Sequence, residues 1–213
     1  MTNSKQDEYT SELHKVYASK SSKETSSIYD DWSEEYEKHM KSVGYAHPAM
    51  VTSMLTRHQP AGNTPVLDAG SGTGIMGELM TALGYSNIAG LDASEGMVAH
   101  AATKGIYQDL RYGLLGQPLG YDDDEFTATV ASGVFTQGHA PLDGLDELIR
   151  VTQPGGHIVF SIGPAYIGDS INNKAQALED AGKWHKVDAS RPYDSTPLGD
   201  DVLMAQVFAF AVV

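Results

Sequence analysis

Val66-Leu67-Asp68-Ala69-Gly70-Ser71-Gly72-Thr73-Gly74 is the stretch that decides the fold of this chain. It joins a short apolar run, typical of a buried strand, to three glycines at alternate positions. Apolar residues with helical spacing follow from Ile75 to Leu83, so the glycines occupy a strand-to-helix turn. Glycine lets a backbone turn tightly and approach a ligand where a Cβ would clash. The stretch therefore predicts a ligand-binding turn between a strand and a helix.

The rest of the chain alternates between strand-like and helix-like segments. Strands are expected at residues 65–69, 88–91, 110–115, 126–131, 157–162, 184–187 and 203–213, and helices at 75–83, 94–103, 142–152 and 172–181. This alternation predicts a doubly wound α/β fold, with a mostly parallel seven-stranded sheet covered by helices on both faces. Pro154-Gly155-Gly156 is expected to form a turn before the fifth strand.

The N-terminal part differs from this pattern. Residues 1–27 are a polar extension, either a frayed tail or, because Leu13, Val16 and Tyr17 have helical spacing, a short docked helix. Ile28, Tyr29, Trp32, Tyr36 and Met40 predict one amphipathic helix, and a second is expected at 48–57. We expect a single domain at 28–213, consisting of a helical cap (28–60), a cofactor-binding half (65–162) and a substrate-side segment with the C-terminal strands (163–213).

Composition excludes several classes of partner and site. A formal net charge of −14 argues against nucleic acid and anionic membrane surfaces as partners. Without cysteine there are no disulfides, thiolate zinc sites or cysteine nucleophiles, and the eight histidines lack metal-binding spacing, so no metal is expected. We find no secretory leader and no apolar run of membrane-spanning length, which favours a cytoplasmic location. Oligomeric state has no readable signal.

The spacing of the glycines indicates the ligand. A dinucleotide-binding loop has the spacing G-x-G-x-x-G, whereas here the spacing is G-x-G-x-G with Asp68 two residues before the first glycine. This pattern resembles motif I of the Rossmann-like S-adenosylmethionine-dependent methyltransferases. Residues 28–37, 107–110 and 115–119 also resemble a methyltransferase-like group typified by the protein from the Williams–Beuren deletion region. The resemblance implies an enzyme with S-adenosylmethionine as cofactor. The alternatives are a non-catalytic module that binds this cofactor and a nicotinamide-dependent oxidoreductase.

The same resemblance implies which positions hold the cofactor. Asp92 matches the acid that binds the ribose hydroxyls, and Ala93 and Met97 lie where adenine-facing residues sit. The family's usual acid after the third strand is replaced by Leu115, so adenine recognition is expected to depend on backbone bonds. Tyr36 matches an aromatic residue that closes over the methionine. The expected cofactor contacts are Tyr36, Asp68, Ala69, Gly70, Gly72, Thr73, Gly74, Asp92, Ala93, Met97, Leu115, Gly116, Ser132 and Gly133.

Catalytic residues are harder to predict. Methyl transfer from a sulfonium depends on proximity and orientation, with a base where the acceptor holds a proton. His139, shortly after the fourth strand, is the candidate for base or substrate contact, and a solvated loop histidine is the alternative. The run Asp122–Glu125 is expected to form a solvated turn, with a divalent-ion site as the alternative. We expect a small-molecule acceptor, whose identity no motif encodes.

Overall fold

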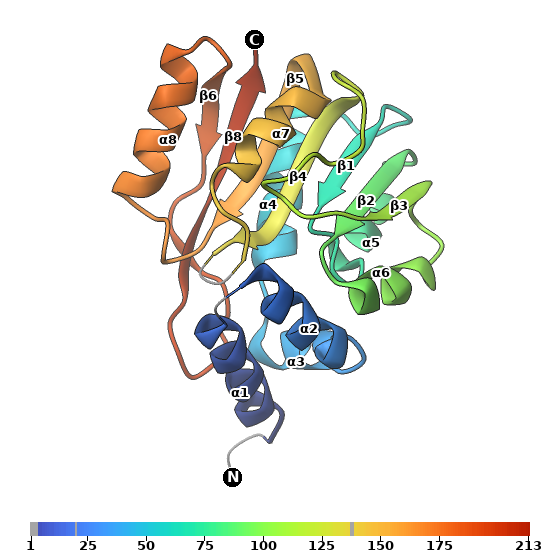
Figure 1. Ribbon diagram of the computed structural model, residues 1–213, viewed down its shortest axis with the longest axis vertical. Helices are drawn as coiled ribbons and strands as arrows, with labels where there is room; N and C mark the ends of the chain where they lie inside the picture. The colour runs from blue at the N-terminus through green and yellow to red at the C-terminus, as the bar shows by residue number, and fades with distance from the viewer. Residues whose placement is uncertain (1–3, 20, 137–138) are drawn as a thin grey trace.

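A single large sheet forms the centre of the molecule in the computed structural model, which describes residues 4–19, 21–136 and 139–213 (Figure 1). The strand order is β3-β2-β1-β4-β5-β8-β6, and the short β7 pairs with β8. The strands are β1 (Val66–Ala69), β2 (Ile88–Asp92), β3 (Asp109–Tyr112), β4 (Phe126–Phe135), β5 (Thr152–Ile162), β6 (Trp184–Ala189), β7 (Tyr193–Asp194) and β8 (Met204–Val212). Strands β1 to β5 pair in parallel and β8 runs antiparallel to its neighbours. The expected mostly parallel α/β fold is confirmed.

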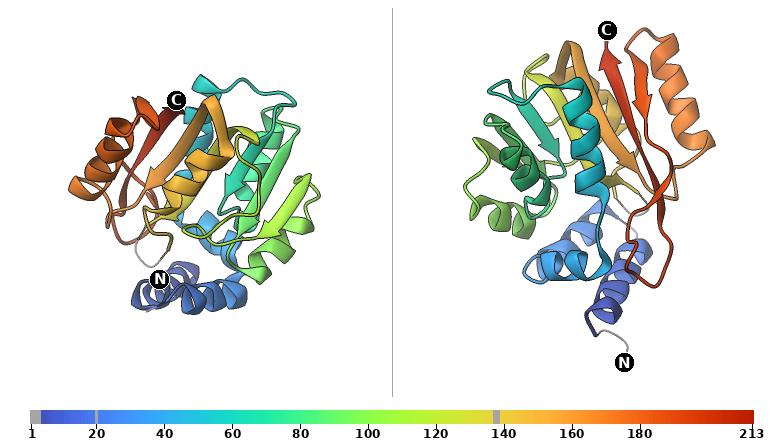
Figure 2. Two further views of the ribbon diagram at one scale, coloured as in Figure 1. Left: turned by 45° about the horizontal axis from the view of Figure 1, so that its top comes forward. Right: turned by 180° about the vertical axis from the view of Figure 1, so that it is seen from behind.

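Helices cover both faces of the sheet (Figure 2). One face carries α4 (His47–His58), α5 (Ile75–Ala82) and α6 (Glu95–Ala102), and the other carries α7 (Gly144–Val151) and α8 (Asp169–Asp180). The core beneath α7 and α8 is aromatic, with the rings of Trp184 and Phe210 stacked at a centroid distance of 4.0 Å. The core beneath α4 and α5 is aliphatic and rich in methionine. Burial of both faces explains why the central strands β1 and β2 are buried along nearly their whole length rather than at alternate residues.

The direction of the strand order reverses at β1. From β1 the order proceeds to β2 and β3 on one side and to β4 and β5 on the other. Ligands of open parallel sheets bind beyond the carboxyl ends of the strands at such a point. The loop after β1 closely approaches the end of β4 here, because a Cβ added to Gly70 would lie 2.2 Å from Cγ2 of Val134. The glycine stretch, which follows β1, therefore lies at the edge of the sheet where such folds bind their ligands.

Three further helices lie across this edge of the sheet, below it in Figure 1: α1 (Ser4–Ala18), α2 (Ser22–Trp32) and α3 (Tyr36–Val43). Between the two alternatives for the N-terminal extension, most of it is helical and docked, with Tyr9 and Val16 buried. The single helix expected from Ile28 to Met40 is wrong: it is two helices with a turn at 33–35. The Ser33 hydroxyl bonds back to the Asp30 carbonyl there, a contact that favours bending the helix. We call α1, α2 and α3 the cap.

Pro154-Gly155-Gly156 does not form the expected turn before β5. These residues lie within β5, where Thr152 pairs with Phe126 and His157 pairs with Ala128, so β5 has extra residues opposite a short piece of β4. Proline cannot donate to a ladder, and Gly155 has a φ of +77°, so both residues suit a bulge. The expected turn is therefore a bulge in a longer strand.

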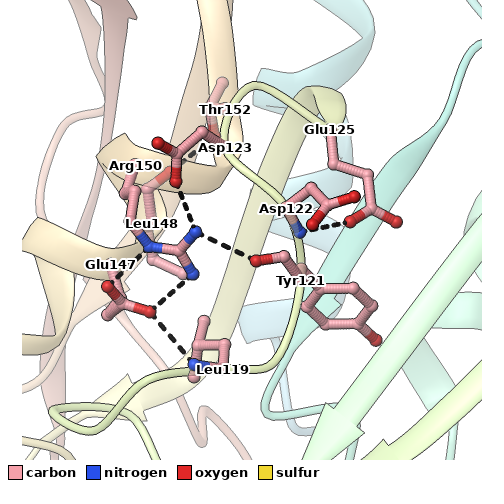
Figure 3. Close-up of polar contacts among 9 residues, drawn as sticks. All are labelled: Leu119, Tyr121, Asp122, Asp123, Glu125, Glu147, Leu148, Arg150 and Thr152. Atoms are coloured by element: carbon pink, nitrogen blue, oxygen red, sulfur yellow. Dashed lines mark hydrogen bonds and ion pairs between the residues drawn. The ribbon is translucent and has the colours of Figure 1, made fainter.

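The acidic run at residues 122–125 forms the expected turn, and Arg150 on α7 holds it (Figure 3). The Arg150 guanidinium donates to Glu147, to the Tyr121 carbonyl at 2.9 Å and to Asp123 at 2.7 Å. Within the described residues, no group of three or more acidic or histidine side chains could hold a metal ion. In the same part of the chain, no helix is both long and apolar enough to cross a membrane. The turn thus contributes to the scaffold.

Candidate functional site

A cavity opens at the carboxyl ends of β1, β2 and β4, beneath the cap. Its volume, including the open mouth, is about 770 Å³. We call it the main cavity. It is lined by Thr25, Ser26, Tyr29, Tyr36, Tyr45, Gly70, Gly72, Leu91, Asp92, Ala93, Ser94, Met97, Gly113, Leu114, Leu115, Ser132, Gly133, Val134, His139 and Ala140.

The glycine loop forms one wall of the main cavity. Gly70, Gly72 and Gly74 have φ values of +87°, +52° and +93°, a region that side chains with a Cβ rarely adopt. Gly74 caps the N-terminus of α5, so the positive end of that helix dipole lies at the loop. The Ser71 hydroxyl is buried and has no hydrogen-bond partner among the described residues. The loop therefore lets a ligand approach its backbone closely, and the Ser71 hydroxyl is available to bind a ligand.

Asp92 connects the glycine loop to the start of α6. Its Oδ2 accepts from the Gly72 N–H at 2.8 Å, and its Oδ1 accepts from the Ser94 N–H at 2.9 Å. Burial raises the pKa of Asp92, and the backbone N–H groups of Gly72 and Ser94 lower it in part by stabilising the charge. A carboxylate can accept about four hydrogen bonds, so about two further donors can be bound from the cavity side. Asp92 is thus a fixed acceptor on the cavity wall.

Asp68 occupies a different environment. Its side chain is fully buried and does not line the main cavity; Oδ2 accepts from the Tyr107 hydroxyl at 2.7 Å, while Oδ1 has no partner among the described residues. Burial is the main cause that raises the pKa of Asp68 to about 7; the Tyr107 hydrogen bond opposes the rise, and the Asp92 charge adds to it. Tyr107 fits because Gly77 and Gly90 leave space: added Cβ atoms would lie 2.5 and 2.9 Å from its ring or hydroxyl. The structure adds Tyr107 to the residues that support the loop.

The cap is fastened to α6 by Asp30. Its Oδ1 accepts from the Ser94 hydroxyl at 2.6 Å and from the Gly96 N–H at 2.9 Å. A Cβ on Gly96 would lie 2.9 Å from the Asp30 Cα, so only glycine permits this approach of α2 to α6. Sequence reasoning missed both residues; the only signal was an unexplained glycine in the first turn of a helix.

The residues that the sequence singled out fall into two groups. Those that line the main cavity are Tyr36, Gly70, Gly72, Asp92, Ala93, Met97, Leu115, Ser132, Gly133 and His139. Those that lie outside its lining are Asp68, Ala69, Thr73, Gly74 and Gly116. The second group consists of neighbours in sequence of the first, so the structure brings the whole set to one edge of the sheet.

A second cavity adjoins the main one, and five residues line both: Tyr29, Tyr36, Tyr45, Gly133 and His139. The lining of this second cavity, which we call the aromatic chamber, also includes Tyr9, Leu13, Tyr17, Trp32, Met40, His47, Thr136, Gly163, Pro164, Ser195, Thr196 and Leu203. At the junction the Tyr29 hydroxyl and His139 Nε2 share a short hydrogen bond, which joins the cap to the loop after β4. Nothing in the spacing of these residues signals that they meet, because they come from segments far apart in the chain.

His47, at the start of α4, is a buried titratable group in the wall of the chamber. It is only 6% exposed, and its Nδ1 lies 2.7 Å from the Tyr193 hydroxyl of β7. Burial, with a further contribution from the neighbouring His139, lowers the pKa of His47 to about 4. His47 is therefore neutral at physiological pH. Nothing in the sequence selects this residue, since it stands at a helix start without a motif.

Comparison with known proteins identifies the domain. Residues 67–160, which contain the glycine loop, Asp92 and the end of β4, match the family model described as "Methyltransferase domain". The chain carries a methyltransferase domain. The expected resemblance to Rossmann-like methyltransferases is confirmed.

Two curated relatives and one solved structure show how far the similarity extends. Over 164 residues, 74% of this chain, it is 29% identical to human Methyltransferase-like protein 27. Over 146 residues, 67% of this chain, it is 30% identical to Demethylmenaquinone methyltransferase of Clavibacter sepedonicus. The matches span 66% and 59% of those relatives, so this chain covers less than two thirds of their length. A TehB-like SAM-dependent methyltransferase from Corynebacterium glutamicum has the same fold, with a TM-score of 0.61, 19% identity and coverage of 85% of this chain and 98% of its own.

Proposed function

We propose that this chain transfers a methyl group from S-adenosylmethionine to a small-molecule acceptor, with the cofactor in the main cavity. The observation that carries the proposal is the junction of two cavities at the carboxyl ends of the parallel strands. One cavity has the left-handed glycine loop and a fixed carboxylate, and the other has an aromatic lining. A donor in the first cavity and an acceptor in the second would meet at Gly133.

The residues around the main cavity fit the parts of the cofactor. Asp92 would accept hydrogen bonds from the two ribose hydroxyls, and Ala93, Met97, Leu115 and Gly116 would surround the adenine. The methionine part would be held by the glycine loop and by residues around it. These residues are Ala69, Gly70, Thr73, Gly74, Ser132, Gly133 and Tyr36. Asp68 would stabilise the cationic ammonium from behind the loop, since its Oδ1 has no partner among the described residues. These assignments place the cofactor beside polar groups that have no partner among the described residues and in space that the glycines leave open.

The chemistry asks little of the protein beyond placement. The cofactor supplies a methyl group on a positively charged sulfur, which is already activated for displacement. The chain contributes proximity and orientation, worth about 7–11 kcal/mol in well-oriented reactions. The cap, held by Asp30 on α6, covers the site and limits the access of water. His139 lies at the junction of both cavities and remains our candidate for contact with the acceptor.

A small acceptor suits the lining of the second cavity. Its walls come from the cap, from the loops after β4 and β5, and from the β7–β8 connection, so a small molecule bound there would have protein on several sides. The formal charge of −14 also disfavours a nucleic-acid acceptor. Demethylmenaquinone methyltransferase, a relative of this chain, is named for an acceptor of small size.

Thermal unfolding with added cofactors and a turnover assay together test the proposal. S-adenosylmethionine and S-adenosylhomocysteine should raise the unfolding temperature, whereas NAD should not, because a ligand stabilises only the state that binds it. With a library of small acceptors, formation of S-adenosylhomocysteine above the acceptor-free rate is expected. Stabilisation by NAD alone would support an oxidoreductase. Cofactor binding without turnover of any acceptor would support a non-catalytic binding module.

A further inference from the structure

The aromatic chamber has a lining without formal charge. The described residues that form it include five tyrosines, one tryptophan, two histidines and three Ser or Thr residues, but no Asp, Glu, Lys or Arg. Burying an unpaired charge is costly, so such a lining rejects ions and accepts flat apolar groups that carry a hydroxyl or carbonyl. The lining therefore indicates the class of molecule that the chamber can bind.

His47 presents one unused nitrogen in this chamber. Its Nδ1 is engaged with the Tyr193 hydroxyl, while Nε2 has no hydrogen-bond partner among the described residues. The ring edge that carries Cδ2, the atom next to Nε2, lies toward Gly133: an added Cβ there would be 3.6 Å from Cδ2. Gly133 lines both cavities. The free nitrogen thus lies beside the junction where donor and acceptor would meet.

We infer that the acceptor is an uncharged phenol-like molecule bound in the aromatic chamber, and that His47 Nε2 takes its hydroxyl proton during methyl transfer. This inference rests on the proposed function and deepens it. Tyr193 is the positioning residue: when Nδ1–H donates to the Tyr193 oxygen, the lone pair of Nε2 is free.

The step balances in atoms, electrons and charge. A lone pair of the acceptor oxygen forms the new O–C bond, the electron pair of the C–S bond stays on sulfur, and the O–H proton moves to Nε2. The positive charge passes from sulfonium to imidazolium, and no other reactant is needed. The low pKa of His47, which burial and His139 cause, keeps it unprotonated before the step. An imidazole of that pKa still accepts a proton from the oxygen as it becomes methylated, because an alkylated hydroxyl is a much stronger acid.

Three other groups face His47, and none competes for this role. Tyr45 contacts the ring edge-on at a centroid distance of 5.3 Å, and burial keeps its hydroxyl protonated by raising its pKa. Tyr193 is likewise held protonated, because burial raises its pKa. His139 uses its Nε2 for the Tyr29 hydroxyl of the cap. We therefore assign His139 to acceptor contact at the junction and His47 to proton transfer.

A matched series of phenols tests the acceptor class on this chain saturated with S-adenosylhomocysteine. The series is 4-ethylphenol, tyramine and 4-hydroxyphenylacetate, which differ mainly in charge. Fluorescence of Trp32, which lines the chamber, reports binding, and Trp32→Phe removes the signal while leaving Trp184 as the background. The neutral phenol should bind at least about tenfold more tightly than either ion. Equal or tighter binding of an ion, or no binding of 4-ethylphenol at millimolar concentration, would overturn the inference.

Nitrogen-15 spectra of histidine-labelled protein test the role of His47 without turnover. His47→Asn identifies the resonances, and asparagine retains a polar atom near the Nδ1 position. In the wild type, Nδ1 should carry the proton at neutral pH, and 4-ethylphenol should shift Nε2 and not Nδ1. A proton on Nε2, or an Nε2 resonance that does not respond to the bound phenol, would contradict the assignment.

Kinetics with 4-ethylphenol complete the test. His47→Asn should lower kcat by about 100-fold or more, as expected for loss of a general base, with unchanged affinity for S-adenosylhomocysteine. Tyr193→Phe should lower kcat about tenfold without raising KM, because only the tautomer is disturbed. His139→Asn should act mainly on KM. Normal cofactor affinity without methylation of 4-ethylphenol, or kcat of His47→Asn within about threefold of the wild type, would refute this inference alone. Absent cofactor binding would refute the proposed function.

Discussion

The glycine loop and the aromatic chamber are adjacent, yet they are built in opposite ways. The loop and its partners Asp92 and Ser94 lie within one βαβ unit, and backbone N–H groups make the contacts. The chamber collects side chains from Tyr9 in α1 to Leu203 before β8, through tertiary packing of the cap against distant loops. The contrast suggests that cofactor binding depends on local backbone geometry, whereas acceptor binding depends on how the cap is docked.

The largest effect is expected at the loop. Asp92→Asn removes the charge and replaces one of the two acceptor oxygens by an NH2 donor, which faces a backbone N–H and cannot accept from a ribose hydroxyl; hydrogen bonds to a charged group contribute about 1.5–3 kcal/mol each. Affinity for S-adenosylhomocysteine should fall by about 100-fold or more by calorimetry. Asp109→Asn, a half-exposed carboxylate paired with Arg111, is the matched control and should leave affinity unchanged. Equal affinities of the two variants would contradict the claim that cofactor binding depends on Asp92 and the glycine loop.

Burial of the Asp68 carboxyl behind the glycine loop should lower the free energy of unfolding at neutral pH. Because burial raises its pKa from 3.8 to about 7, the folded protein keeps a proton that the unfolded chain releases. Stability therefore falls as pH rises between these values, by about 1.4 kcal/mol per unit. Asp68→Asn removes this dependence on pH. The free energy of unfolding of the variant minus that of the wild type should therefore rise by about 2 kcal/mol from pH 5 to pH 7. Denaturant unfolding at both values measures it, and an advantage independent of pH would contradict the account.

Detaching the cap should affect the cofactor less than damage to the loop. Asp30→Ala removes the acceptor of the Ser94 hydroxyl and the Gly96 N–H, and we expect about tenfold weaker binding of S-adenosylhomocysteine. Hydrogen exchange should become faster in α1 to α3 and stay unchanged in the sheet. Asp31→Ala, at the exposed neighbouring position, is the control. Faster exchange throughout the sheet would mean that the cap is part of the core and not a separate layer.

The smallest effect is expected at the Arg150 cluster, whose residues line neither cavity. Arg150→Met removes the bonds to Glu147, Tyr121 and Asp123 and should cost about 1 kcal/mol, since the cluster is partly exposed. For a chain of this size that lowers Tm by about 2–4 °C. Cofactor affinity should not change. The exposed Arg191→Met is the control for loss of charge. A change in affinity would show that the acidic turn reaches the site.

The same contrast explains what the sequence could predict. The parallel strands, the loop and the acid at Asp92 follow from local periodicity and spacing, and all the expected strands are present in the sheet. The break between α2 and α3 was missed because the aromatic stripe continues through it, and packing alone decides where the backbone bends. The bulge at Gly155 was missed because a proline-glycine pair has the same appearance in a turn. His47, Tyr193 and Asp30 carry no pattern, since each depends on a partner from another part of the chain.

A crystal structure of the full chain with bound S-adenosylhomocysteine tests the central claim most directly. We predict that the ribose hydroxyls contact the Asp92 carboxylate, that the adenine lies between Met97 and Leu115, and that the sulfur faces the aromatic chamber at Gly133. Ligand bound outside the main cavity, or a sulfur that points away from the chamber, would contradict the account.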